Sequence, residues 1–312
     1  MIYQSLKFLK QKILGPILSI PRLRLIDKKI VSELLNNFNT LKSLIDIRSL
    51  KPATGLLRSI QLKNCEFTKE IIAELEQNGI KPFMIAGTLL GAERHKGYIP
   101  WDDDLDFGVI RDDYKKILEY SRKNFVVCYQ NINKYRYNYS TRETIKKILL
   151  KYPNKTVLLI YPFLYKFIKG TSLSDYVQMD LFPFDYYKDD YKYSDFIKKT
   201  KKIIDKLWLI NNTLKEIEFL NEQREKDSHI VEKSNKIFYG NDNCDAQNFE
   251  TLNKCSDFMK TSDFFPLKRM QFEETEFWAP NNHIQYLENY IGKNWNSIPD
   301  NIIPPQIEER EG

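Results

Sequence analysis

Apolar and polar residues follow one another along this chain in patterns that predict both helices and buried strands. In residues 31–64 and 68–78 apolar side chains recur at helical spacing, with Thr68 and Gly79 suited to begin and end the second helix. Short apolar runs typical of buried strands occupy residues 82–86, 107–110, 125–129 and 177–182. Strands and helices in this order predict an α/β (α+β) fold with a mixed sheet at its core.

Four aspartates stand within five positions where one of these apolar runs begins. Asp104 and Asp106 are two residues apart, so they point to one face of an extended chain, and Asp102 joins them if the strand begins early. Carboxylates this close repel one another unless a cation compensates their charge. The pattern therefore predicts a divalent cation that bridges to substrate phosphate, Mg²⁺ in the first place and Mn²⁺ as the alternative.

A solvated acidic loop and a calcium loop both fit these acids less well. A solvated loop would not be joined to an apolar strand on one side and a glycine-bearing turn on the other. A calcium loop requires glycine at its sixth position and glutamate at its twelfth, where a count from Asp102 finds Phe107 and Asp113.

The turn before the acids carries groups that suit a phosphate. Gly87 and Thr88 interrupt the apolar run and offer backbone N–H groups and a hydroxyl, which favours an anion if a helix begins there. Arg94, His95 and Lys96 add positive charge nearby. The sequence therefore predicts that Gly87, Thr88 and Arg94 bind the phosphate of a donor.

The residues from Gly87 to Asp106, Gly-Thr-Leu-Leu-Gly-x-x-Arg-x-x-Gly-x-Ile-Pro-Trp-Asp-Asp-Asp-x-Asp, resemble the signature of the LicD/fukutin-related family. Residues 179–185 and 272–295 resemble it as well, although Ile291 separates a Tyr-Gly pair that is common in the family. The resemblance implies a nucleotidyltransferase-like fold. It also implies transfer of a phospho-alcohol, such as phosphocholine or ribitol phosphate, from a CDP-activated donor to a glycan hydroxyl.

The resemblance further implies roles for the acids. Asp104 and Asp106 would hold the metal, with Asp102 assisting. Asp180 stands alone in an apolar strand, where a charged side chain is costly unless it is paired, and it fits the third acid that nucleotidyltransferase-like folds carry on an adjacent strand. It would hold a second metal ion or take the proton from the acceptor hydroxyl, unless it is an aspartate satisfied by backbone donors at a strand end.

The remaining segments predict how the chain is organised. Residues 1–66 are expected to form a helical, basic N-terminal region and residues 67–312 the catalytic domain. Within the former, the basic and apolar residues 1–30 predict contact with an anionic membrane surface or, equally, an ordinary packed helix. Residues 131–176, rich in lysine, arginine and tyrosine, predict an insertion that is an acceptor-binding or membrane-facing lobe, or a plain subdomain, rather than a nucleic-acid surface.

Composition narrows the class of protein further. The chain has 312 residues, of which 42% are hydrophobic and 29% charged, as is typical of globular proteins. A net charge of +6 suits an anionic substrate or an anionic membrane surface. Four widely spaced cysteines, with neither a long apolar run nor a clean signal peptide, predict a cytoplasmic protein with possible peripheral contact on the inner face of the membrane.

These observations predict a Mg²⁺-dependent enzyme that moves a phospho-alcohol from a CDP-alcohol to a cell-surface glycan and releases CMP, with no nucleic-acid partner. Three alternatives stay open. The protein could be a nucleotidyltransferase proper, which releases pyrophosphate, or a glycosyltransferase with an Asp-x-Asp site, which releases a nucleoside diphosphate. It could also be a non-catalytic glycan-binding or scaffold protein that kept the fold.

Overall fold

The computed structural model of the protein describes residues 30, 32–33, 36–40, 42–130, 138–210, 212–242 and 251–299. The predicted membrane contact through residues 1–30 therefore lies outside the described residues, apart from Ile30. Within the described ranges, no helix combines the length and the apolar character that crossing a bilayer requires.

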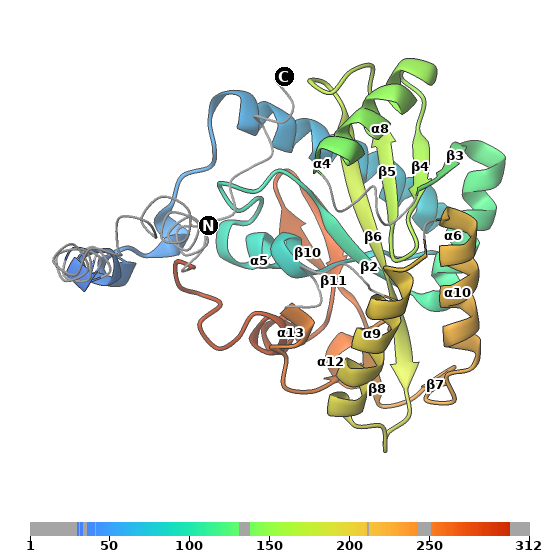
Figure 1. The fold of residues 1–312 in the computed structure, drawn as a ribbon. Coiled ribbons are helices and arrows are strands. Elements are labelled where there is room, and N and C mark those ends of the chain that lie inside the picture. Colours follow the sequence, from blue (N-terminus) through green and yellow to red (C-terminus); the bar gives the residue numbers. More distant parts are fainter. Residues whose placement is uncertain are drawn as a thin grey trace, which may run out of the picture.

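One mixed sheet, built from eleven described strands, forms the centre of the molecule (Figure 1). The strands are β1 (Phe83–Met84), β2 (Asp106–Ile110), β3 (Val126–Tyr129), β4 (Val157–Ile160), β5 (Tyr165–Lys169), β6 (Val177–Tyr187), β7 (Ile230–Val231), β8 (Lys236–Tyr239), β9 (Met259–Lys260), β10 (Lys268–Phe272) and β11 (Thr275–Ala279). Their main order is β10-β11-β1-β2-β6-β5-β4-β3, with β7 and β8 added to β6, and β9 to β8. The pairs β1/β11, β2/β6 and β3/β4 are parallel and the others antiparallel, which confirms the predicted α/β class with a mixed sheet.

Helices pack on both faces of this sheet. They are α4 (Gly55–Gln77), α5 (Ala86–His95), α6 (Arg111–Asn124), α8 (Asn138–Lys151), α9 (Tyr193–Leu207), α10 (Thr213–Glu225), α12 (Thr261–Phe264) and α13 (His283–Tyr290), with a 3₁₀ helix at Ile47–Ser49. In the view of Figure 1, α4 passes behind the strands, whereas α9 lies in front of them. The inner strands β4, β5 and β6 thus form a buried layer, and this explains their apolar sequences.

Helix α4 is longer than the sequence pattern predicted. It begins at Gly55, with Thr54 at its N-cap, so Thr68 is buried in its interior and does not begin the helix. No proline or glycine lies between Leu56 and Thr68, and each further helical residue adds a hydrogen bond once the helix has formed. Gly79 does follow the helix end, with a φ of +74°. The predicted division between residues 66 and 67 falls inside this helix.

The segment predicted as an insertion is part of the central sheet. Strands β4 and β5 both come from residues 131–176, and β5 pairs directly with β6. All four residues of β4 are buried, while Lys146 and Lys147 lie exposed on α8. The basic composition of the segment, which suggested a separate lobe, reflects the surface of α8 and conceals two core strands.

The C-terminal part of the chain returns to the start of the motif. Strands β10 and β11 form a hairpin, and β11 pairs in parallel with β1 through Trp278 and Phe83. Helix α13 follows this hairpin. The strand that leads into the Gly87–Asp106 motif is therefore held between β2 on one side and the hairpin on the other.

Candidate active site

Strand register brings two of the predicted acids side by side. Asp106 is the first residue of β2, and Asp180 lies opposite it in the parallel pairing of β2 with β6. The N–H of Asp180 donates to the carbonyl of Leu105 at 2.9 Å, which fixes this register where β2 begins. Since paired residues present their side chains on the same face of a sheet, the two carboxyl groups are neighbours.

Asp102 and Asp104 join this pair from the loop that precedes β2, and not from the strand itself. The carboxyl group of Asp102 shares a hydrogen bond with that of Asp104. Burial, and then the charges of Asp104 and Asp106, raise the pKa of Asp102 well above its ordinary value. Gly87 leaves room for the Asp102 carboxyl group, because a Cβ on residue 87 would lie only 2.8 Å from Asp102 Oδ2. The structure thus gathers Asp102, Asp104 and Asp106 into one cluster.

The chemistry of this cluster fits a hard divalent cation. Its donors are all carboxylate oxygens, and the mutual repulsion that raises the pKa of Asp102 is what a cation would relieve. In the described ranges, no three His, Cys, Asp or Glu side chains are arranged to hold a metal ion by themselves. Mg²⁺ commonly takes one or two carboxylates and completes its coordination with water and substrate phosphate, so Asp104 and Asp106 suit a partial site of that kind.

Gly87 and Thr88, two of the predicted phosphate-binding residues, lie at the amino-terminal end of α5 beside the acids. N–H groups at a helix start, together with the helix dipole, favour an anion at this point. The hydroxyl oxygen of Thr88 accepts the N–H of Asp106 at 2.8 Å, and the side chain is buried. Thr88 therefore ties the helix start to the first residue of β2.

Arg94, the third predicted phosphate ligand, lies elsewhere. About two helical turns separate it from Gly87, a rise of roughly 10 Å. Its guanidinium donates to the carbonyls of Trp295 at 3.0 Å and Ser297 at 3.5 Å. Burial lowers its pKa to about 10, whereas a nearby carboxylate would raise it. The structure thus gives Arg94 the task of anchoring the C-terminal segment.

Lys166 lies in the candidate site, and the sequence pattern did not reveal it. It pairs with Asp180 across β5 and β6, and its ammonium nitrogen lies 2.9 Å from Asp180 Oδ1. The sequence signal is a lysine inside the apolar run Leu164-Tyr165-Lys166-Phe167-Ile168, which mirrors Asp180 inside its own apolar run. Two opposite charges, each isolated in a core strand, indicate a pair once the register is known.

Two buried amides of α4 position the acidic loop. Gln61 Nε2 donates to the carbonyl of Asp102 at 2.8 Å, and Asn64 Nδ2 donates to the carbonyl of Asp103 at 2.7 Å. Asn64 Oδ1 also accepts the N–H of Gln178 on β6 at 3.0 Å. Asn64, which is fully buried, thus joins the acidic loop to the strand that carries Asp180.

Replacing Asn64 by alanine is expected to destabilise the protein by about 3 kcal/mol, because a carbonyl and an N–H would each lose their partner in a buried place. Lys63→Ala, at the exposed neighbouring position of the same helix, should change stability by less than about 0.5 kcal/mol. Equilibrium unfolding in denaturant measures both variants. Equal midpoints for the two would show that Asn64 does not hold the loop.

The β10–β11 hairpin holds the start of the same loop. Glu273, at its turn, forms a two-pronged ion pair with Arg58 of α4, at 2.9 and 2.5 Å, and accepts the N–H of Tyr98 at 3.0 Å. Arg58 and the Tyr98 N–H more than offset the effect of burial, so the pKa of Glu273 lies below its ordinary value. The hairpin and α4 are therefore linked by charge immediately before the acidic cluster.

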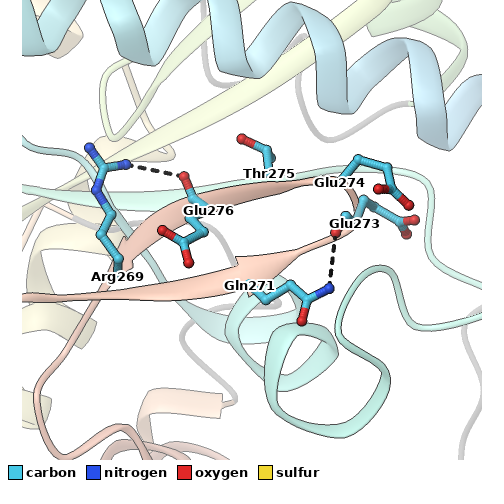
Figure 2. A pocket seen from close by; sticks show the side chains of 6 residues that line it. All are labelled: Arg269, Gln271, Glu273, Glu274, Thr275 and Glu276. Carbon is cyan, nitrogen blue, oxygen red and sulfur yellow. Dashed lines mark hydrogen bonds between the residues drawn. The ribbon is translucent and has the colours of Figure 1, made fainter.

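The outer side of this hairpin carries an open polar hollow of about 470 Å³ (Figure 2). Figure 2 shows Arg269 bonded to the carbonyl of Glu276 at 3.1 Å and Gln271 to that of Glu273 at 3.4 Å. The hollow is lined by Arg269, Gln271, Glu273, Glu274, Thr275 and Glu276. It contains none of the clustered aspartates, so we do not assign the reaction to it.

Comparison with known proteins agrees with the resemblance seen in the motif. Residues 79–223 match the family model of the LicD/FKTN/FKRP nucleotidyltransferase domain. This range contains the acidic cluster, the start of α5, Asp180 and Lys166, whereas α4 and the β10–β11 hairpin lie outside it. The predicted resemblance to the LicD/fukutin-related family is thereby confirmed.

Individual relatives are similar over shorter segments. Lipopolysaccharide cholinephosphotransferase LicD of Haemophilus influenzae is 37% identical over 89 residues, which are 28% of this chain and 31% of that protein. Ribitol 5-phosphate transferase FKRP is 40% identical over 48 residues in both Mus musculus and Homo sapiens, which are 15% of this chain and 10% of theirs. The chain thus spans less than a third of the length of these curated relatives.

Proposed function

Because residues 79–223 match the LicD/FKTN/FKRP nucleotidyltransferase domain, we propose that this protein transfers a phospho-alcohol from a CDP-activated donor to a hydroxyl of a cell-surface glycan. The hydroxyl oxygen attacks the phosphorus next to the alcohol, the bond from that phosphorus to CMP breaks, and CMP leaves. The observation that carries the proposal is the gathering of Asp102, Asp104, Asp106 and Asp180 around the start of β2, beside the start of α5.

Each group of the site takes one part in this proposal. Asp104 and Asp106 would hold Mg²⁺ or Mn²⁺, with Asp102 beside them. The bound ion would neutralise the donor phosphates, which is the main need in phosphoryl transfer. The backbone at Gly87 and the start of α5 would orient the phosphate through N–H groups. Asp180, next to Asp106, would face the acceptor hydroxyl.

The proposal is tested by release of CMP from a panel of CDP-alcohols, with Mg²⁺ and a crude surface glycan present. We expect release from one donor, and a loss of roughly a thousandfold in Asp106→Asn, because charge neutralisation and positioning supply most of the acceleration. Asp112→Asn serves as the matched control, since Asp112 is exposed on α6 and pairs with Lys115 on the surface.

The nature of the product separates the alternatives. Pyrophosphate in place of CMP would identify a nucleotidyltransferase proper, and a nucleoside diphosphate would identify a glycosyltransferase. No product with any donor, although the glycan acceptor is present, would favour the non-catalytic binding protein. Full activity of Asp106→Asn would contradict the assignment of this acidic cluster as the site.

A further inference from the structure

Three charged residues form a row across neighbouring strands in the centre of the sheet. Asp106 of β2 is paired with Asp180 of β6, and Asp180 is paired with Lys166 of β5. Side chains at paired positions share a face of the sheet, so Asp180 stands between the acidic cluster on one side and an ammonium group on the other.

Lys166 is held firmly in this row. Its Nζ lies 2.9 Å from Asp180 Oδ1 and donates to Gln178 Oε1 at 3.1 Å. The side chains of Lys166 and Asp180 are only 8% and 5% exposed. The ammonium group is therefore fixed beside the Asp180 carboxylate by an ion pair and a hydrogen bond, both in a buried place.

Stability does not explain why the chain keeps this pair. Two ions buried together recover little more than the cost of removing them from water, and an apolar pair of similar size often serves as well. The pair is also not needed to hold the two strands together, because β5 and β6 are already joined by backbone pairing from Tyr165 to Lys169. The position of the pair, adjacent to Asp106, points to a role in the site.

We propose that Lys166 supplies the positive charge that a second metal ion would otherwise bring to Asp180, so that this protein binds one divalent cation and not two. An ion bound through the same carboxylate would stand close to a fixed ammonium group in a buried place, where like charges repel strongly. The single ion therefore belongs to Asp104 and Asp106. Lys166 is a positioning residue, which holds the Asp180 carboxylate in place without metal.

This inference rests on the proposed function only in the use of a divalent cation. Counting Mn²⁺ bound to the purified full chain, by electron paramagnetic resonance of the free ion, tests it without any donor or acceptor. We expect one Mn²⁺ per chain. A count of two, or of none, would overturn the inference, whereas the identity of the nucleotide product bears only on the proposed function.

Two variants show which acids hold the ion. Asp106→Asn should weaken Mn²⁺ binding at least about tenfold, since it removes a ligand, whereas Asp180→Asn should change it by less than about threefold. Asp180→Asn leaves an amide in a polar place and keeps the size of the side chain. Equal weakening by the two substitutions would contradict the inference.

Removing the ammonium group should create the missing site. Lys166→Met keeps most of the length of the side chain but leaves Asp180 without its cation, and a second, weaker Mn²⁺ is then expected. Lys166→Arg keeps the charge and should still bind one ion. If Lys166→Met still binds one Mn²⁺, the inference that Lys166 takes the place of a second metal ion is wrong. If Lys166→Met does not fold, the wild-type count and the comparison of Asp106→Asn with Asp180→Asn decide the matter.

Discussion

Asp104→Asn is expected to lower transfer activity roughly a thousandfold and at the same time to make the metal-free protein more stable. After burial, the charge of Asp104 contributes most to the raised pKa of Asp102. An asparagine amide at this position can donate to the Asp102 carboxyl group in place of repelling it. The acids would thus be arranged to bind a cation, and this arrangement would lower the stability of the metal-free protein.

Activity with the identified donor and thermal unfolding in the presence of a chelator measure the two effects. Asp113→Asn is a suitable control, because Asp113 pairs with Lys116 on the surface of α6 and should leave activity unchanged. Loss of activity together with a lower unfolding temperature for Asp104→Asn would show that Asp104 supports the fold. The interpretation of the cluster as a strained cation site would then be wrong.

Arg111→Met is expected to be the most destabilising substitution, at about 3–5 kcal/mol. Arg111 is buried at the start of α6 and forms two-pronged ion pairs with Asp185, at 2.9 and 2.7 Å, and with Asp242, at 2.8 and 2.7 Å. Without the guanidinium, two neighbouring buried carboxylates would have lost their shared cation. Removing one partner from such a network costs far more than the intact network contributes.

Lys116→Met provides the comparison on the same helix, since its ion pair with Asp113 is exposed and should be worth less than about 0.5 kcal/mol. Denaturant unfolding of both variants gives the two free energies. In Arg111→Met, the loss should shrink when Asp185→Asn and Asp242→Asn are added, because the uncompensated charges are then removed. A loss that stays unchanged in that triple variant would assign the effect to packing.

The cluster of acids was predictable because its signal is local. Asp102, Asp104 and Asp106 lie within five positions, and the apolar run after them identifies the strand. The place of Asp180 beside them was also predictable, since a single charge in a core strand requires a compensating neighbour. These inferences require only the alternation of side chains along one strand, and not the identity of the strands beside it.

Contacts that depend on register or on helix direction could not be predicted in this way. Lys166 faces Asp180 only because β5 is antiparallel to β6 in one register, and a shift by one residue would turn its side chain to the other face. Arg94 is close to Gly87 in the sequence, but it lies near the end of α5, away from the start of that helix. Asn64 and Gln61 lie on a helix whose start the sequence pattern misplaced.

The hold of α4 and the hairpin on the acidic loop has a consequence for modularity. The range that matches the family model begins after α4 and ends before the hairpin. The loop is nevertheless fixed from outside that range, by Arg58, Gln61, Asn64 and Glu273. Residues 79–223 alone would also leave β1 as a two-residue edge strand with no β11 beside it. We therefore expect that the matched range does not fold by itself in this protein, and that its acidic loop needs both outside elements to keep its shape.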